Sequence, residues 1–158
     1  MDRELGTIAL VLIAMVAGFA FLQPILPTNN QRYSELGILG PQKTIGGYPS
    51  NLLANQTFLL YLYIGNHEGA VGYYQVQVKL GNQSTVISNV TSAQAPLIYS
   101  YSYVLDDNQN ATFPINLAIN QTGINERIIF ELWSYNETAL DFSYTGLWNQ
   151  LWVNVTGA

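Results

Sequence analysis

The sequence contains no cysteine, a single histidine and few charged residues, and each shortage excludes a class of protein. Without cysteine the chain has no disulfide framework, no thiolate metal site and no thiol nucleophile. Charged residues make up 9% of the chain, against about 25% in ordinary soluble domains. The formal net charge of −5 disfavours nucleic-acid binding, which needs a basic surface to displace counterions. We therefore expect no nucleic-acid partner and no cofactor.

Hydrophobic and aromatic residues are abundant instead, at 49% and 13% of the chain, with eleven Tyr. A length of 158 residues accommodates one domain together with an anchor. We divide the chain into an N-terminal membrane anchor helix (residues 1–26), a linker (residues 27–32) and an extracytoplasmic β-sandwich domain (residues 33–158).

The anchor is predicted from an uncharged apolar run. Residues 5–22 are apolar apart from Thr7, and this length of helix extends about 27 Å, close to the thickness of a bilayer core. We expect a single transmembrane helix, because a segment within lipid must satisfy its own backbone hydrogen bonds. Small residues that would allow close packing against another helix are Ala14, Ala17, Gly18 and Ala20.

Two other interpretations of the run remain open. Gly18-Phe19-Ala20 resembles the cleavage site of a signal peptide, although the preceding Asp2-Arg3-Glu4 lacks the positive charge of such a peptide. An apolar N-terminal helix followed by a β-domain is also the architecture of a pilin, whose helix packs in a filament core. A pilin would be processed just before the run, which distinguishes it from a retained anchor.

Seven Asn-x-Ser/Thr sequons follow the run, none with Pro in the middle. With fifteen Asn, and Ser or Thr at about one position in eight, chance predicts roughly two such sites. The excess indicates an extracellular domain that carries covalent N-glycans. The alternative is a surface that is merely rich in Asn and Thr. The candidate glycosylation sites are Asn55, Asn82, Asn89, Asn110, Asn120, Asn136 and Asn154.

The region after the linker is predicted to be mainly β. Period-two alternation between turn signals favours an immunoglobulin-like antiparallel β-sandwich of seven or eight strands. Pro114 predicts an edge strand. The alternation puts Lys79 on the face of its strand opposite Tyr74 and Leu80, and puts the tyrosines of residues 97–105 on the face opposite Ser100 and Ser102. The predicted strands cover residues 33–39, 58–64, 72–80, 97–105, 112–119, 127–135 and 147–155.

Candidate chemistry is sparse. Asn66-His67-Glu68-Gly69 is interpreted as a hairpin connection, with a His67–Glu68 metal or proton site as the alternative. The segment 106–110 is interpreted as a solvated turn, because its oxygen donors lack the spacing of a calcium loop.

Three carboxylates and three tryptophans complete the candidates. A glycosidase needs two carboxylates, and the candidates for such a pair are Glu126, Glu131 and Asp141. Their spacing in the sequence does not single out two of the three. The tryptophans are interpreted as core or a buried patch, with a sugar-binding platform as the alternative; they are Trp133, Trp148 and Trp152. We therefore predict no catalytic or metal site and no enzymatic activity.

Several segments carry a resemblance to a known family. They are Tyr33–Pro41, Gly47–Leu52, Gly65–Glu68, Tyr73–Val76 and Leu151–Val155, and they span roughly residues 32–155. In this order they resemble the archaeal membrane-protein family catalogued as domain of unknown function 1616. The resemblance implies an archaeal, membrane-attached protein with an extracytoplasmic β-rich portion, and it implies no reaction. Many relatives carry several membrane helices before this domain, whereas one is expected here.

Together these features predict a single-pass cell-membrane protein with an extracellular C-terminal domain. Its expected role is that of a structural or accessory subunit of a larger membrane or cell-envelope complex. The alternatives are a pilus-like filament subunit and a carbohydrate-binding or adhesive module.

Overall fold

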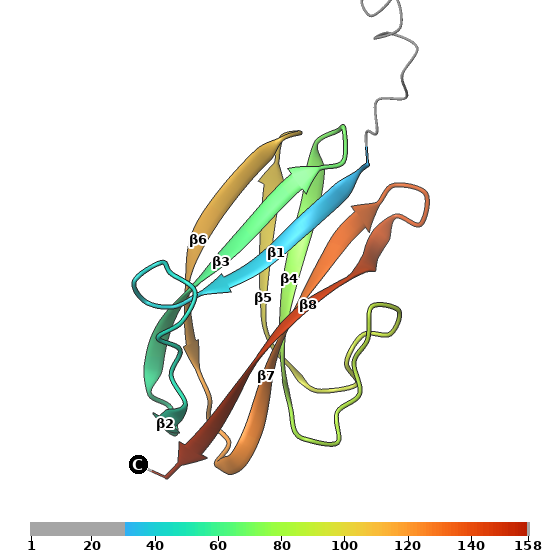
Figure 1. The fold of residues 1–158 in the computed structure, drawn as a ribbon. Helices are drawn as coiled ribbons and strands as arrows, with labels where there is room; N and C mark the ends of the chain where they lie inside the picture. The colour runs from blue at the N-terminus through green and yellow to red at the C-terminus, as the bar shows by residue number, and fades with distance from the viewer. Residues whose placement is uncertain (1–30, 158) are drawn as a thin grey trace, which may run out of the picture. The chain divides into compact units, whose positions relative to one another are not determined.

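The computed structural model describes residues 31–157, which form a two-layered β-sandwich. The expected anchor helix, including its four small residues, lies outside the described residues, and the described part contains no helix that would span a bilayer. Eight strands follow one another along the chain (Figure 1): β1 (Tyr33–Leu39), β2 (Asn51–Leu53), β3 (Thr57–His67), β4 (Gly72–Gly81), β5 (Leu97–Leu105), β6 (Gln109–Ala118), β7 (Gly123–Asn136) and β8 (Asp141–Thr156).

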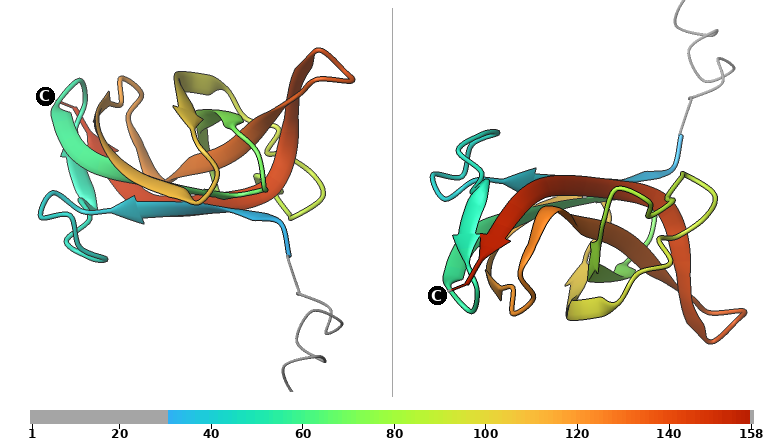
Figure 2. Two further views of the ribbon diagram at one scale, coloured as in Figure 1. Left: turned by 90° about the horizontal axis from the view of Figure 1, so that it is seen from above. Right: turned by 90° about the horizontal axis from the view of Figure 1, so that it is seen from below.

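The strands are divided between two sheets. One sheet has the order β1-β3-β6, and the other has the order β2-β8-β7-β4-β5. Every pairing is antiparallel except that of β2 with β8, which is parallel. The chain crosses between sheets after β1, β2, β3, β5 and β6, whereas β4 is followed by β5, and β7 by β8, within one sheet. This arrangement confirms a β-sandwich, whose two sheets enclose a common interior (Figure 2), and the parallel β2–β8 pair departs from the antiparallel pairing that the sequence predicts.

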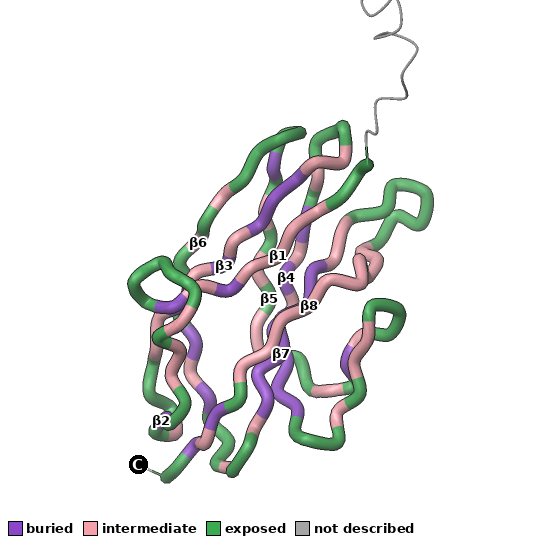
Figure 3. The backbone as a smooth tube through the Cα atoms, in the orientation of Figure 1, coloured by how far each residue is buried: buried purple, intermediate pink, exposed green. Residues whose placement is uncertain are grey.

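The core forms where the alternating residues of both sheets meet. Tyr74, Val76, Val78 and Leu80 of β4 are all buried, as the alternation predicts. They pack with alternate residues of β3 and with the centre of β7, and burial concentrates in these strands (Figure 3). At about 25 cal/mol per Å² of apolar surface, such a cluster supplies the main stabilisation of a domain that lacks disulfides.

Pro114 lies in β6, at the edge of the three-stranded sheet, as predicted. The free side of this edge is capped by tyrosines of β5, which point inward rather than outward. The Tyr99 hydroxyl lies 3.1 Å from both the N and the O of Ala118, and the Tyr101 hydroxyl donates to the carbonyl of Asn116 at 3.2 Å. These hydroxyls bond to backbone groups that have no strand partner because β6 is at the edge of its sheet. The tyrosines are half-buried and the serines between them are exposed, which agrees with the alternation that the sequence shows.

Four strands differ most from the sequence prediction. β2 was not predicted, because only three residues pair, and their partner in β8 lies about one hundred residues later. β7 and β8 extend beyond the predicted 127–135 and 147–155, since they continue as a long hairpin that ends at Asn136 and Asp141. β3 is buried mainly on one face, with Leu60, Leu62 and Ile64 inside.

Candidate functional site

One end of the sandwich brings together several of the polar residues singled out by the sequence: His67, Glu68, the segment 106–110 and Asp141. β1 begins there at Tyr33, β3 and β5 end there, and β4 and β6 begin there (Figure 1). The β7–β8 hairpin lies at the same end. We call it the N-terminal end of the domain, because the chain enters the sandwich at this point.

Asn66 is the centre of the hydrogen bonding at this end. Its side chain is fully buried, and its Nδ2 lies 2.8, 3.0 and 3.1 Å from the carbonyl oxygens of Ala70, Leu105 and Asp106. Its Oδ1 accepts hydrogen bonds from the Glu68 amide at 3.2 Å and from the Tyr74 hydroxyl at 2.9 Å. The amide thus holds two inter-sheet connections together.

The hairpin predicted at residues 66–69 is wrong. Asn66 and His67 are the last residues of β3, and the chain then passes to β4 in the other sheet. Gly69, with φ of +78°, supplies the turn geometry that the sequence suggested. Asn66 was taken for a turn former because a buried asparagine and a turn asparagine look alike in sequence.

A hollow of about 390 Å³ opens beside this network. Ser34, Glu68 and Tyr74 contribute polar groups to its lining, and Tyr73 and Tyr135 contribute aromatic rings. The Ser34 hydroxyl donates to Glu68 Oε1 at 2.7 Å and lies 3.0 Å from the Tyr74 hydroxyl. Burial raises the pKa of Tyr74, and its one hydroxyl hydrogen is donated to Asn66 Oδ1.

His67 and Glu68 have different partners and do not form a joint site. The His67 ring stacks on Tyr33 with centroids 4.6 Å apart, and its Nε2 lies 3.7 Å from Glu35 Oε2. That carboxylate also accepts a hydrogen bond from Tyr63 at 2.8 Å, which raises the pKa of Tyr63. Within residues 31–157 no group of three or more ligating side chains is placed to hold a metal ion.

Residues 106–108 form the turn between β5 and β6, as the preferred interpretation predicts, and residues 109–110 already belong to β6. Asn108 adopts a φ of +59°, and the Gln109 amide donates to the Asp106 carbonyl at 3.1 Å. Asp107 Oδ1 accepts the Gly69 amide at 2.8 Å, which joins this turn to the β3–β4 connection.

Next to the hollow, four apolar side chains form a line across the outer face of the five-stranded sheet. Tyr73 of β4 is paired with Val104 of β5, and Tyr135 of β7 is paired with Phe142 of β8. The ring of Tyr73 lies 6.0 Å from that of Tyr135 and 5.0 Å from that of Phe142. We call these four residues the apolar row. No sequence pattern could have found it, because the row depends on the register of four strands.

The apolar row is open to solvent. Val104 is 64% exposed, Tyr73 43% and Tyr135 38%. The nearby connections add Val71 and Leu140, which are 65% and 75% exposed. Clustered exposed apolar side chains on a soluble domain mark an interaction surface more often than a solvated one.

The middle of the same outer face is covered by the β4–β5 connection, residues 82–96. Lys79 Nζ lies 2.8 Å from Glu131 Oε2 and donates to the Ala93 carbonyl at 3.0 Å. Glu131, with no exposed surface, also accepts the Ala93 amide at 2.5 Å and the Trp133 indole at 3.1 Å. Lys79 lies on the face opposite the core residues of β4, as the alternation predicts, and it is nevertheless buried because this connection folds over it.

The three tryptophans lie along this outer face, next to cations of the same chain. The Arg127 guanidinium is 5.6 Å from the Trp148 ring and 5.4 Å from the Trp152 ring. Lys79 Nζ lies 5.5 Å from the Trp133 ring. These cation–π contacts occupy ring faces that a sugar would need, which favours the patch interpretation over a sugar platform.

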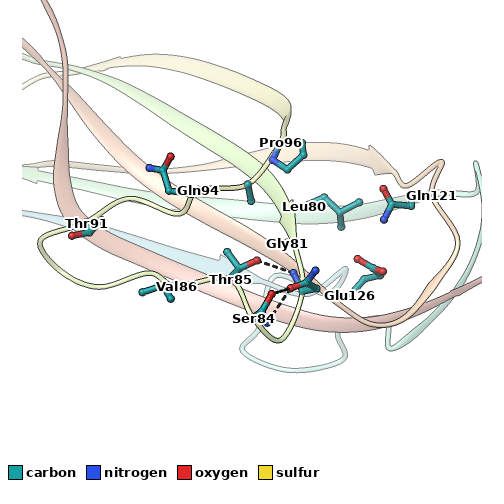
Figure 4. Close-up of a pocket in the computed structure, with 12 residues that line it drawn as sticks. Leu80, Gly81, Ser84, Thr85, Val86, Thr91, Gln94, Pro96, Gln121 and Glu126 are labelled. Carbon is teal, nitrogen blue, oxygen red and sulfur yellow. Dashed lines mark hydrogen bonds between the residues drawn. The ribbon is translucent and has the colours of Figure 1, made fainter.

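The three candidate carboxylates are not brought together. Glu131 is buried in the middle of β7. Asp141 is paired with Asn136 at one end of this strand, whereas Glu126 is paired with Val153 near the other. Glu126 lines a second hollow of about 540 Å³, between the β4–β5 connection and Gln121 (Figure 4). In that hollow, Asn82 accepts hydrogen bonds from both the amide and the hydroxyl of Ser84.

Six of the seven sequon asparagines are exposed, and Asn154 alone is half-buried. The Asn154 side chain accepts a hydrogen bond from the Asn125 amide and donates one to Asn51 at 3.2 Å. A glycan on Asn154 would therefore need local rearrangement, whereas the other six side chains are accessible.

Alkaline pH is expected to destabilise the domain through its half-buried tyrosines. Burial raises the pKa of Tyr101 and of Tyr144 from 10.0 to about 12. Because the folded state holds these protons more tightly than the unfolded state, the stabilisation is complete below about pH 10 and is lost as the pH rises toward 12. Urea unfolding across this range, followed with tyrosinate absorbance, measures the loss. A midpoint that did not fall, or that fell equally in a Tyr101→Phe, Tyr144→Phe variant, would contradict this assignment.

Comparison with known proteins places these features in a family context. A family model described as "Domain of unknown function (DUF1616)" matches residues 27–154. No curated protein matches the chain.

Several solved structures have a similar arrangement of strands at low sequence identity. A CARDB domain from Pyrococcus furiosus, crystallised in complex with di-metal ions, is 14% identical with a TM-score of 0.49, over 79% of this chain and 89% of that one. A β-glucosidase from Listeria innocua in complex with glucose is 14% identical with a TM-score of 0.46, over 80% of this chain and 16% of the enzyme. The sporulation control protein Spo0M from Bacillus subtilis is 7% identical with a TM-score of 0.43, over 77% of this chain and 49% of that one.

Proposed function

This chain belongs to the family described as "Domain of unknown function (DUF1616)", and we propose that it is an accessory subunit of a larger membrane or cell-envelope complex. In this proposal an N-terminal helix anchors it in an archaeal cell membrane, and the sandwich lies outside the cell and carries N-glycans. The observation that carries the proposal is the apolar row, a solvent-exposed surface that a partner would cover.

The position of the row supports a partner in the membrane. The apolar run ends at Leu22 and β1 begins at Tyr33, and the residues between them extend at most about 35 Å. An anchor in the run would therefore keep the N-terminal end of the domain within that distance of the bilayer. A partner with an extracellular part close to the membrane would reach the apolar row.

The accessible sequons support an extracellular location. The exposed asparagines lie on connections and strand ends on several sides of the sandwich, where oligosaccharides can project without disturbing the core. Asn136 is the exception in one respect, because it follows Tyr135 of the apolar row directly. A glycan on Asn136 would compete with a partner for this surface.

The proposal is tested by native mass measurement after extraction of the full chain from its own membranes in mild detergent. We expect an assembly in which this chain, of 17.5 kDa before modification, is bound to at least one different subunit. A lone monomer would overturn the proposal. A homopolymer whose N-terminus is trimmed just before Leu5 would favour the filament alternative instead.

Glycopeptide analysis of the same material tests the location. We expect sugar on most of the six exposed sites and lower occupancy at Asn136 and Asn154 than at Asn55 and Asn89. A chain with no sugar at any site would contradict the extracellular assignment.

A further inference from the structure

Carboxylates surround the apolar row. Two belong to the β7–β8 hairpin beside Tyr135 and Phe142, two to the β5–β6 turn after Val104, and one lines the hollow next to Tyr73. In chain order they are Glu68, Asp106, Asp107, Glu137 and Asp141. The one Lys or Arg of the described residues at this end is Arg32, near Gly69. The surroundings of the row are therefore strongly negative.

No Lys, Arg or His of residues 31–157 forms an ion pair with these carboxylates. In residues 31–157 the two ion pairs are His67–Glu35 and Lys79–Glu131, and neither includes any of the five. Their hydrogen bonds come from neutral donors, such as the Ser34 hydroxyl to Glu68 and the Gly69 amide to Asp107. The negative charge at this end is available to a partner.

We infer that the apolar row and its carboxylates bind a protein surface in which Lys or Arg side chains surround apolar residues. This inference rests on the proposed accessory function and specifies the chemistry of the partner. The apolar row would form the desolvated centre of the interface, and the carboxylates its polar rim. Charge complementarity at the rim increases the rate and the specificity of association.

The charge argues against two other occupants. A second copy would bring the same carboxylates face to face, and a bilayer of anionic lipids would repel them. Both would cover the apolar side chains, but each would place like charges opposite one another. A basic protein surface satisfies both the apolar and the charged part of the site.

The hollow beside the row fits one cationic side chain of the partner. Its lining combines the Glu68 carboxylate with the rings of Tyr73 and Tyr135. An ammonium or guanidinium group placed between a carboxylate and aromatic rings forms an ion pair with the first and a cation–π contact with the second. The hollow, at about 390 Å³, is large enough for such a side chain.

Site-specific photo-cross-linking tests this inference in the full chain within native membranes. A photoreactive residue replaces Leu140, beside the row, and in a control it replaces Val90, which is 83% exposed on the β4–β5 connection. We expect a cross-link from position 140 to a different polypeptide, in a peptide rich in Lys or Arg, and none from position 90. A Glu137→Lys, Asp141→Lys variant should reduce the yield about tenfold, and Glu126→Lys, far from the row, should leave it unchanged. Thermal unfolding of each variant confirms that it is folded.

The outcomes separate this inference from the function on which it rests. A cross-link to a different subunit through a peptide without Lys or Arg overturns the basic partner but leaves the accessory function standing. A yield unaffected by the charge reversal also overturns the basic partner. Cross-links only to lipid, only to a second copy, or to nothing overturn it as well. If native mass then shows a lone monomer, the accessory function fails too.

Discussion

Replacing Lys79 with Met is expected to lower the free energy of unfolding by about 3–5 kcal/mol, because it leaves the Glu131 carboxylate buried without its cation. The Ala93 carbonyl loses a donor at the same time. Since a typical domain is stable by about 5–15 kcal/mol, this loss is a large fraction of the total. Urea unfolding followed by tryptophan fluorescence measures it, and Trp133, which donates to Glu131, reports on the site directly.

A matched second variant identifies the cause of the loss. Adding Glu131→Gln to Lys79→Met removes the stranded charge. Its one amide oxygen keeps an acceptor for the Ala93 amide, which bonds to Oε1, whereas the Trp133 indole, which bonds to Oε2, loses its acceptor. We expect the double variant to recover more than half of the stability that Lys79→Met loses, as a strong coupling in a double-mutant cycle. If Lys79→Met lay within about 1 kcal/mol of the parent, the ion pair would not hold the β4–β5 connection in place.

The Lys79–Glu131 ion pair could be predicted from the sequence only in part. The alternation Tyr74–Leu80 predicts correctly which side of β4 faces the core, and it puts Lys79 on the other side. Burial of Lys79 then depends on residues 82–96 folding back over the sheet, which no local pattern records. The same alternation located β1 and β5 to the residue, because turn residues bound both strands.

The candidate site was less predictable than the fold for a related reason. Residue type alone was enough to single out Asn66, His67 and Glu68. The groups that hydrogen-bond to them, however, come from β1, β4 and the connection between β5 and β6. The apolar row requires the register of four strands, and a sequence gives strand positions without their pairing. The topology therefore had to be known before these residues could be recognised as neighbours.

Replacing Asn66 with Asp is expected to destabilise the domain by about 3–5 kcal/mol near neutral pH, although the two side chains have almost the same shape. In the parent protein, the side-chain NH₂ group of Asn66 donates to the carbonyl oxygens of Ala70, Leu105 and Asp106. In the variant, a carboxylate oxygen would face these oxygens instead. A charge buried there without a cation raises the pKa of the new carboxyl group above its unfolded value. Its protonated form is therefore favoured by folding, and the deficit grows as the pH rises above about 4.

Denaturant unfolding at about pH 3 and pH 7 tests the direction of this pH dependence, with Asn116→Asp at an exposed position of β6 as the control. The Asn66→Asp deficit should be small in acid and large at neutral pH, whereas the control should differ little from the parent at both. Because Asn66 also holds Glu68 and Tyr74 at the hollow, the same variant should weaken partner binding even where it remains folded. A deficit independent of pH would instead indicate lost packing, and would remove Asn66 from its role as the polar centre of the N-terminal end.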